Sequence, residues 1–204
     1  MKPVLFLSLM NSAAWGGSEE LWHKSAIWLA RKNYPVGVCC FNWPGKQDKL
    51  EQLQKAGCKI YLLPGKNETR SVFGKLKLKK AAKSVPFTEY ETVVINQGGW
   101  MDAAYGLFKK LYKQLPDYIL TYHNYNAREK LPAGKLKLLK EWIINASANI
   151  ACAAEIFSVF KEVYSFEVPR QAVLINPITF TPPDTVTPSA LFGSPRNSIH
   201  MITL

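Results

Sequence analysis

Short apolar runs alternate with segments of helical periodicity along most of this chain. These apolar runs are short, as buried strands of a parallel sheet are. The predicted strands cover residues 3–9, 35–41, 58–64, 91–96, 117–123, 149–153 and 172–176. Helical spacing predicts helices over residues 18–32, 46–56, 71–84, 100–114, 134–147 and from the end of the sixth strand to about residue 164. We therefore expect an α/β fold, a doubly wound and mainly parallel sheet with helices on both faces.

The composition changes after residue 176. Residues 177–197 are rich in proline and predict a linker. Residues 198–204, SIHMITL, form an apolar, strand-like run that has no predicted partner nearby. We expect a domain over residues 1–176, a linker over 177–197, and at 198–204 the start of a C-terminal domain that is missing from the sequence.

Cysteine usage and charge narrow the class of protein. Hydrophobic residues make up 48% of the 204 residues, which is enough to bury a core. The cysteines lack metal-binding or disulfide spacing and lie in apolar segments: Cys39, Cys40, Cys58 and Cys152. We expect buried, reduced thiols in a cytoplasmic protein. The net charge of +11 indicates an anionic partner, which charge alone does not identify.

The loop at residues 11–18, between the first predicted strand and helix, holds the first candidate site. In parallel sheets, ligands bind in such loops beyond the carboxyl ends of the strands. Gly16 and Gly17 permit close approach of a ligand, and Ser18 is a predicted helix N-cap. Free N–H groups at the helix start suit a phosphate, whereas Glu19 and Glu20 would repel it on their side. The alternative is a well-capped turn with no ligand, and the GxGxxG pattern of dinucleotide-binding turns is not met.

Several segments resemble, in order, the N-terminal half of the GT-B glycosyltransferases of family 4. GGSEELWHKSAIWLARKNYPVGVCCF resembles the family's Gly-Gly loop with a nearby glutamate, its first helix and its second strand. YETVVINQGGW resembles its fourth-strand region, and DYILTYHNYN its strand that ends in histidine. ASANIACAAEIFSVFKEV resembles its small-residue strand and the following helix, and AVLINPI its crossing into the second domain.

This resemblance implies the Rossmann-like, acceptor-side domain of a two-domain retaining glycosyltransferase. Such an enzyme transfers a sugar from a nucleotide-sugar donor to a glycan or lipid-linked acceptor, usually without a metal, and no cofactor is expected. The family's pair of donor-domain glutamates has no counterpart here, so this chain alone is expected to be inactive. The alternative is a non-catalytic module that binds a glycan or a lipid-linked sugar. An oxidoreductase or a hydrolase is not favoured, because neither GxGxxG nor GxSxG occurs.

The resemblance also implies roles for individual residues. Gly16 and Gly17 would face the donor diphosphate, and His123 would lie beside the reacting sugar as the catalytic residue, although a structural histidine at a strand end is the alternative. The acceptor would contact residues that follow the fourth and fifth strands: Asn96, Gln97, Gly98, Trp100 and Asn124. From the residues alone, the loop at 96–100 can bind a sugar by hydrogen bonding and stacking, or it can simply start a helix. The sequence departs from the family pattern at Asn124, where glycine or an acidic residue is common, and at INPIT in the crossing.

Two lysine-rich segments, residues 74–83 and 108–114, hold much of the positive charge. Apolar residues interleave with these lysines: Phe73, Leu76, Leu78, Phe108, Leu111 and Tyr112. Such a face suits an anionic membrane surface, whereas a solvated helix face is the common alternative. The lysines that would bind the membrane are Lys75, Lys77, Lys79 and Lys80. Nucleic acid is not expected, because zinc-finger, RNP and helix-turn-helix motifs are absent. The hypothesis is a cytoplasmic protein that contacts the inner face of the membrane peripherally.

Overall fold

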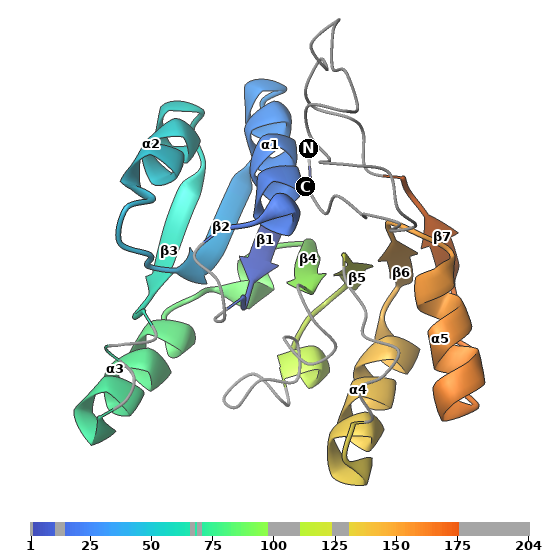
Figure 1. Ribbon diagram of the computed structural model, residues 1–204. Helices are drawn as coiled ribbons and strands as arrows, with labels where there is room; N and C mark the ends of the chain where they lie inside the picture. Colours follow the sequence, from blue (N-terminus) through green and yellow to red (C-terminus); the bar gives the residue numbers. More distant parts are fainter. Residues whose placement is uncertain are drawn as a thin grey trace, which may run out of the picture.

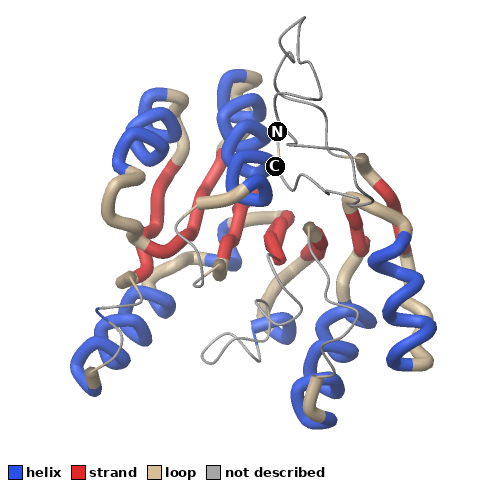
Figure 2. The backbone as a smooth tube through the Cα atoms, in the orientation of Figure 1, coloured by secondary structure: helices blue, strands red, loops and turns tan. Residues whose placement is uncertain are grey.

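One sheet forms the centre of the fold (Figures 1 and 2). The computed structural model describes residues 2–10, 15–65, 68, 71–97, 111–123 and 131–175. The described strands are β1 (Val4–Ser8), β2 (Val36–Phe41), β3 (Lys59–Leu63), β4 (Thr92–Gln97), β5 (Tyr118–Tyr122), β6 (Ala148–Ala151) and β7 (Gln171–Val173). The described α-helices are α1 (Gly17–Arg31), α2 (Gln47–Lys55), α3 (Val72–Lys83), α4 (Ala133–Asn145) and α5 (Glu155–Tyr164).

The strands lie in the order β3-β2-β1-β4-β5-β6-β7, and every neighbouring pair is parallel. This is the Rossmann-like order extended by β7, and the direction of winding reverses between β1 and β4. The register sets Ser8 of β1 beside Asn96 of β4, so these strands end together at the point of reversal. The predicted fold class is confirmed.

Helices cover both faces of the sheet. The helices α1 and α2 lie on one face, and α3, α4 and α5 lie on the other (Figure 1). Side chains of β1 alternate between the two cores: Phe6 packs with residues of α1 and α2, whereas Leu5 and Leu7 pack in the larger core opposite. All three are buried, which explains why β1 is an unbroken apolar run rather than an alternating one.

A buried asparagine ties β5 and β6 together. Asn149 of β6 accepts a hydrogen bond from the Tyr122 hydroxyl at 2.8 Å. Its amide donates to the carbonyl oxygens of Ile143 at 3.2 Å and Pro169 at 2.8 Å. Because the amide group is satisfied within the protein, its complete burial is tolerated. These bonds join the last residue of β5 to β6, and join β6 to α4 and to the segment before β7.

The structure also differs from the predicted elements. The last strand, β7, has three residues and is shorter than the run predicted at 172–176. Of the helix predicted at 100–114, only the end from Leu111 is described, and it is a 3₁₀ turn over Leu111–Lys113. The linker predicted at 177–197 and the run at 198–204 lie outside the described residues. No helix in the described part of the chain is long and apolar enough to cross a membrane.

Candidate functional site

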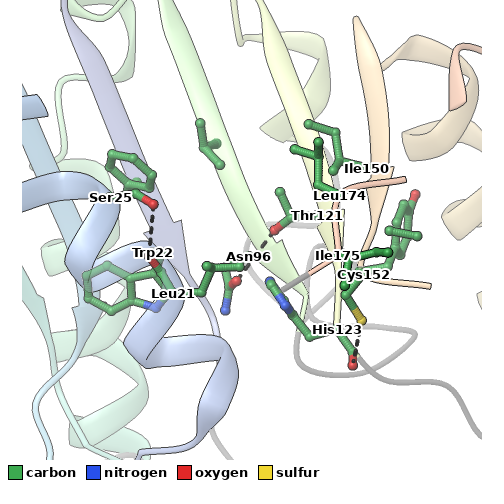
Figure 3. A pocket seen from close by; sticks show the side chains of 14 residues that line it. Leu21, Trp22, Ser25, Asn96, Thr121, His123, Ile150, Cys152, Leu174 and Ile175 are labelled. Atoms are coloured by element: carbon green, nitrogen blue, oxygen red, sulfur yellow. Dashed lines mark hydrogen bonds between the residues drawn. The ribbon is translucent and has the colours of Figure 1, made fainter. Parts of the chain in front are cut away.

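A pocket of about 470 Å³ lies beside α1, at the carboxyl ends of β4, β5 and β6 (Figure 3). Apolar side chains of the sheet, among them Phe6, Val94 and Ile150, form much of its lining. Leu21, Trp22 and Ser25 of α1 line it as well, as do Leu174 and Ile175 after β7. A concave, mainly apolar site with a few polar groups at this edge of a parallel sheet is a typical ligand site.

Asn96 and Thr121 bring hydrogen-bonding groups from neighbouring strands to this pocket. The Thr121 Oγ1 lies 3.4 Å from Oδ1 of Asn96 and 3.3 Å from the carbonyl oxygen of Ile95. The Asn96 side chain is 2% exposed, and its Nδ2 donates to Glu19 at 3.5 Å. Asn96 lines the pocket, and its amide is held in one orientation by protein groups.

His123 follows β5 directly and lines the pocket (Figure 3). Its Nδ1 is buried and has no hydrogen-bond partner among the described residues. A buried nitrogen without a partner costs free energy. Burial lowers the pKa of His123 to about 4. The imidazole is therefore neutral near pH 7 and can offer a ligand a hydrogen bond without a charge.

The same burial makes the stability of the protein sensitive to acid. Below about pH 6.5 the unfolded chain binds a proton at His123 that the folded chain does not bind until about pH 4. The free energy of unfolding should therefore fall as the pH drops through this window. Between about pH 7 and about pH 5, the free energy of unfolding of the parent protein should fall further than that of His123→Asn, by about 1–2 kcal/mol. Urea unfolding at both pH values measures this difference.

His23 also contributes to the acid sensitivity of the stability. Burial lowers the pKa of His23 as well, so both proteins should keep the acid sensitivity that His23 contributes. Equal losses in the parent and in His123→Asn would show that His123 is not buried in its neutral form.

Glu19 binds the loop that the sequence predicted to hold a phosphate. Its carboxylate is buried, and Oε2 accepts hydrogen bonds from the Gly16 N–H at 3.1 Å and from the Ser18 hydroxyl at 2.7 Å. Its Oε1 accepts from Ser8 at 3.3 Å and from Asn96 at 3.5 Å. Burial raises the pKa of Glu19, and the hydrogen bonds from Ser18, Gly16 and Ser8 oppose that shift. One carboxylate thus joins the ends of β1 and β4 to the start of α1.

This arrangement corrects the predicted capping of α1. The N-cap is Gly16 and not Ser18, because the Ser18 hydroxyl donates to Glu19 instead of accepting from the first turn. Gly16 and Glu19 exchange two hydrogen bonds, since the Glu19 N–H donates to the Gly16 carbonyl at 3.1 Å. The Gly16 amide is therefore occupied. Among the described residues, the backbone N–H groups of Gly17 and Ser18 have no acceptor. These two N–H groups are therefore the ones at the start of α1 that can bind an anion.

Glu20, the second acidic residue of α1, has a different environment. Lys49 forms an ion pair with Glu20, and Nε1 of Trp15 donates to its carboxylate at 2.9 Å. Burial acts to raise the pKa of Glu20, but the hydrogen bonds from Lys49 and Trp15 outweigh it and lower the pKa. Repulsion of an anion, expected from both glutamates, therefore comes mainly from Glu19, which has no cationic partner within the described ranges.

Sequence reasoning missed two contributors to this region. Trp22 lines the pocket, is 3% exposed, and has an Nε1 without a partner in the described part of the chain. Nothing in the local pattern marks Trp22 as a site residue, because only the strand order places α1 beside β4. The role of Glu19 did carry a signal. Its position three residues after Gly16 is capping-box spacing.

The remaining predicted acceptor residues are only partly covered by the structure. Gln97 ends β4, and nothing is described of its side chain. Gly98, Trp100 and Asn124 lie outside the described residues. The acceptor-binding role predicted for these four residues stays a prediction.

The cysteines are free thiols, as expected, and three of them are buried. Cys152 is partly buried, lines the pocket, and donates through its Sγ to the His123 carbonyl at 3.5 Å. Burial raises the pKa of the Cys152 thiol, so it is protonated near pH 7 and a poor nucleophile. Within the described residues, no three His, Cys, Asp or Glu side chains gather as metal ligands.

Comparison with known proteins adds a likeness in architecture. No protein-family model and no curated protein sequence matches the chain. A candidate oxidoreductase from Escherichia coli K-12 is similar over 84% of this chain and 93% of its own, with 11% identity and a TM-score of 0.41. Leucoanthocyanidin reductase from Vitis vinifera, solved with NADPH, is similar over 84% of this chain and 78% of its own, with 10% identity and a TM-score of 0.30. Neither likeness bears on function.

Proposed function

We propose that this chain is the acceptor-side domain of a retaining glycosyltransferase, which transfers a sugar from a nucleotide-sugar donor to a glycan or lipid-linked acceptor. The observation that supports this best is the pocket beside α1. There, the polar side chains of Ser25, Thr121 and His123 accompany apolar side chains of the sheet. A sugar needs this combination, since its hydroxyls take hydrogen bonds and its C–H faces take apolar contact.

The predicted site residues other than Gly16 have roles in this proposal. His123, at the end of β5, bonds a sugar hydroxyl next to the reacting carbon. Asn96, with the predicted contacts from Gln97, Gly98, Trp100 and Asn124, orients the acceptor. The Gly17 amide at the start of α1 takes part in binding the donor diphosphate, in place of the Gly16 amide that Glu19 already occupies.

A transfer assay separates this function from the non-catalytic alternative. The complete gene product should move labelled sugar from one member of a panel of nucleotide sugars to a glycan or lipid-linked acceptor. The product should keep the anomeric configuration of the donor, as read by NMR. Binding of glycan without transfer would support a glycan-binding module and overturn the enzyme. Absence of both transfer and glycan binding would overturn both proposals.

Replacing Gly17 with valine tests the proposed diphosphate contact. Gly17 is exposed at the first position of α1, so the protein should tolerate the change, but the branched side chain would block close approach of a diphosphate. We expect transfer by the complete gene product to fall by about 10²-fold, the typical effect of losing a backbone donor to developing charge.

Gly134→Val is the matched control. Gly134 lies in the first turn of α4, away from the pocket, and a Cβ there meets no atom within 4 Å. This variant should retain transfer. Unchanged turnover in Gly17→Val would contradict the diphosphate contact, even if the enzyme proposal holds.

A further inference from the structure

The outer face of α3 exposes large apolar side chains next to lysines. Val72 is 72% exposed, Phe73 is 83% exposed and Leu76 is 58% exposed. An ordinary surface helix turns such residues inward and presents polar ones to water. We propose that this face of α3 binds the surface of an anionic lipid bilayer.

The geometry of α3 separates a core face from this outer face. Gly74 and Leu78 are buried against the sheet, and Ala81 and Ala82 pack at the edge of the same core. At 100° per residue, Leu76 projects almost directly away from that core, and Val72 and Phe73 flank it, each rotated by roughly 50° to opposite sides. The helix therefore buries its small residues and Leu78, and leaves three large apolar side chains protruding.

The lysines of α3 surround the protruding residues. The segment Val72–Lys83 contains five lysines and no acidic residue, which is nearly half of the net charge of +11. Lys77 pairs with Glu68 at 2.6 Å. No ion-pair partner within the described ranges is found for the other four, which are Lys75, Lys79, Lys80 and Lys83. Their long stems can lie along an apolar phase while the ammonium groups reach lipid headgroups.

The structure narrows the surface that the sequence predicted for membrane contact. Leu78 and Leu111 were expected to face the lipid, but they are 6% and 8% exposed and belong to the core. Tyr112 donates a hydrogen bond to Glu141 of α4 at 2.6 Å, so it is engaged within the protein. Phe108 lies outside the described residues. Among the described residues, the surface that remains is the outer face of α3, at Val72, Phe73, Leu76 and the lysines around them.

The combination of charge and apolar exposure favours a bilayer over other partners. A second copy of this chain would place two lysine-rich faces against each other, which like charges oppose. Nucleic acid would satisfy the lysines but offers no apolar phase for Phe73 and Val72. An anionic bilayer offers both, and its fluid interface adapts to side chains that protrude from a convex helix. This inference does not depend on the proposed transfer reaction.

Vesicle co-sedimentation tests this surface. The chain should bind vesicles of phosphatidylcholine with about a third phosphatidylglycerol, and bind pure phosphatidylcholine vesicles roughly tenfold or more weakly. The charge variant, Lys75→Gln with Lys79→Gln and Lys80→Gln, should weaken binding to the anionic vesicles roughly tenfold or more. The apolar variant, Phe73→Ser with Leu76→Ser, should also weaken it by roughly tenfold or more, because insertion of apolar side chains is lost.

Matched controls lie on the helices of the opposite face. Lys24, Lys32 and Lys55 are exposed on or next to α1 and α2, and Trp28 of α1 is 59% exposed. The control for the charge variant changes these three lysines to glutamine, and the control for the apolar variant is Trp28→Ser. Both controls should leave vesicle binding unchanged. Circular dichroism should show that all variants keep the fold, since every altered residue is exposed.

Three outcomes would overturn the proposal. One is parent protein that fails to bind anionic vesicles. Another is loss of binding in the controls equal to the loss in the α3 variants. The third combines two results. The protein binds duplex or single-stranded DNA, and this binding is lost in the charge variant but kept in the apolar variant. In addition, the apolar variant binds vesicles as well as the parent protein does.

Discussion

Replacing Glu19 with alanine should lower the free energy of unfolding by about 2–4 kcal/mol. The change removes a buried acceptor from four donors: the Gly16 N–H, the hydroxyls of Ser8 and Ser18, and the Asn96 amide. Each donor that stays buried without a partner costs about 1–3 kcal/mol. Burial raises the pKa of Glu19, which shows that its charged form is destabilised inside the protein. Removing that charge therefore offsets part of the cost. Urea unfolding at neutral pH measures the difference.

Glu20→Ala is the control for this prediction. Both glutamates lie in the first turn of α1, so both lose the same favourable interaction with the helix dipole. Glu20, however, is partly exposed and bonds to Lys49 and Trp15, so its loss should cost about 1 kcal/mol or less. Equal losses in the two variants would mean that the dipole, and not the buried network, accounts for the stability that Glu19 provides.

Replacing His123 with alanine should lower transfer by the complete gene product about 10²-fold or more, through loss of a hydrogen bond to the reacting sugar. Because burial lowers the pKa of His123 to about 4, this loss should not depend on pH near neutrality, where the imidazole is uncharged. Stability should fall much less than turnover, since Nδ1 has no hydrogen bond to lose among the described residues. Turnover and urea unfolding, measured on the same preparations, separate the two effects.

His23→Ala provides the contrasting case. His23 is also buried, but its Nε2 bonds the Lys49 carbonyl at 3.1 Å, and the residue does not line the pocket. This variant should lose stability and keep its turnover once folded. A His123→Ala protein that unfolds instead of losing turnover would support a structural histidine at the end of β5.

The sequence predicted different roles for these two histidines, a site residue at position 123 and a structural or exposed residue at position 23. Both sit in apolar surroundings, and the sequence separated them only by position, one on a helix and one at a strand end. The strand-end position led to the correct placement of His123, because the carboxyl ends of parallel strands meet at one edge. It could not show that Nδ1 lacks a partner, which depends on side chains from other elements.

The start of α1 was the harder case. Glycine, serine and glutamate at residues 16–20 allow more than one cap, and local chemistry favoured Ser18 as the N-cap. The tertiary structure decided otherwise, because Ser8 of β1 and Asn96 of β4 end beside Glu19 and donate to it. A carboxylate with that many donors is stable when buried, and it then takes the Gly16 amide as well.

The sequence by itself determined the seven strands, their parallel arrangement and the five α-helices that the structure describes, but not the segment at residues 100–114. These follow from apolar runs and helical periodicity, which are local patterns that many residues share. Only the tertiary structure decided which side chains meet: Trp22 with the pocket, Glu19 with Asn96, and Leu78 with the core while Phe73 stays exposed. The physical reason is that such contacts join residues far apart in the chain. They depend on strand order and on the rotation of each helix about its axis, and neither is encoded in a local pattern.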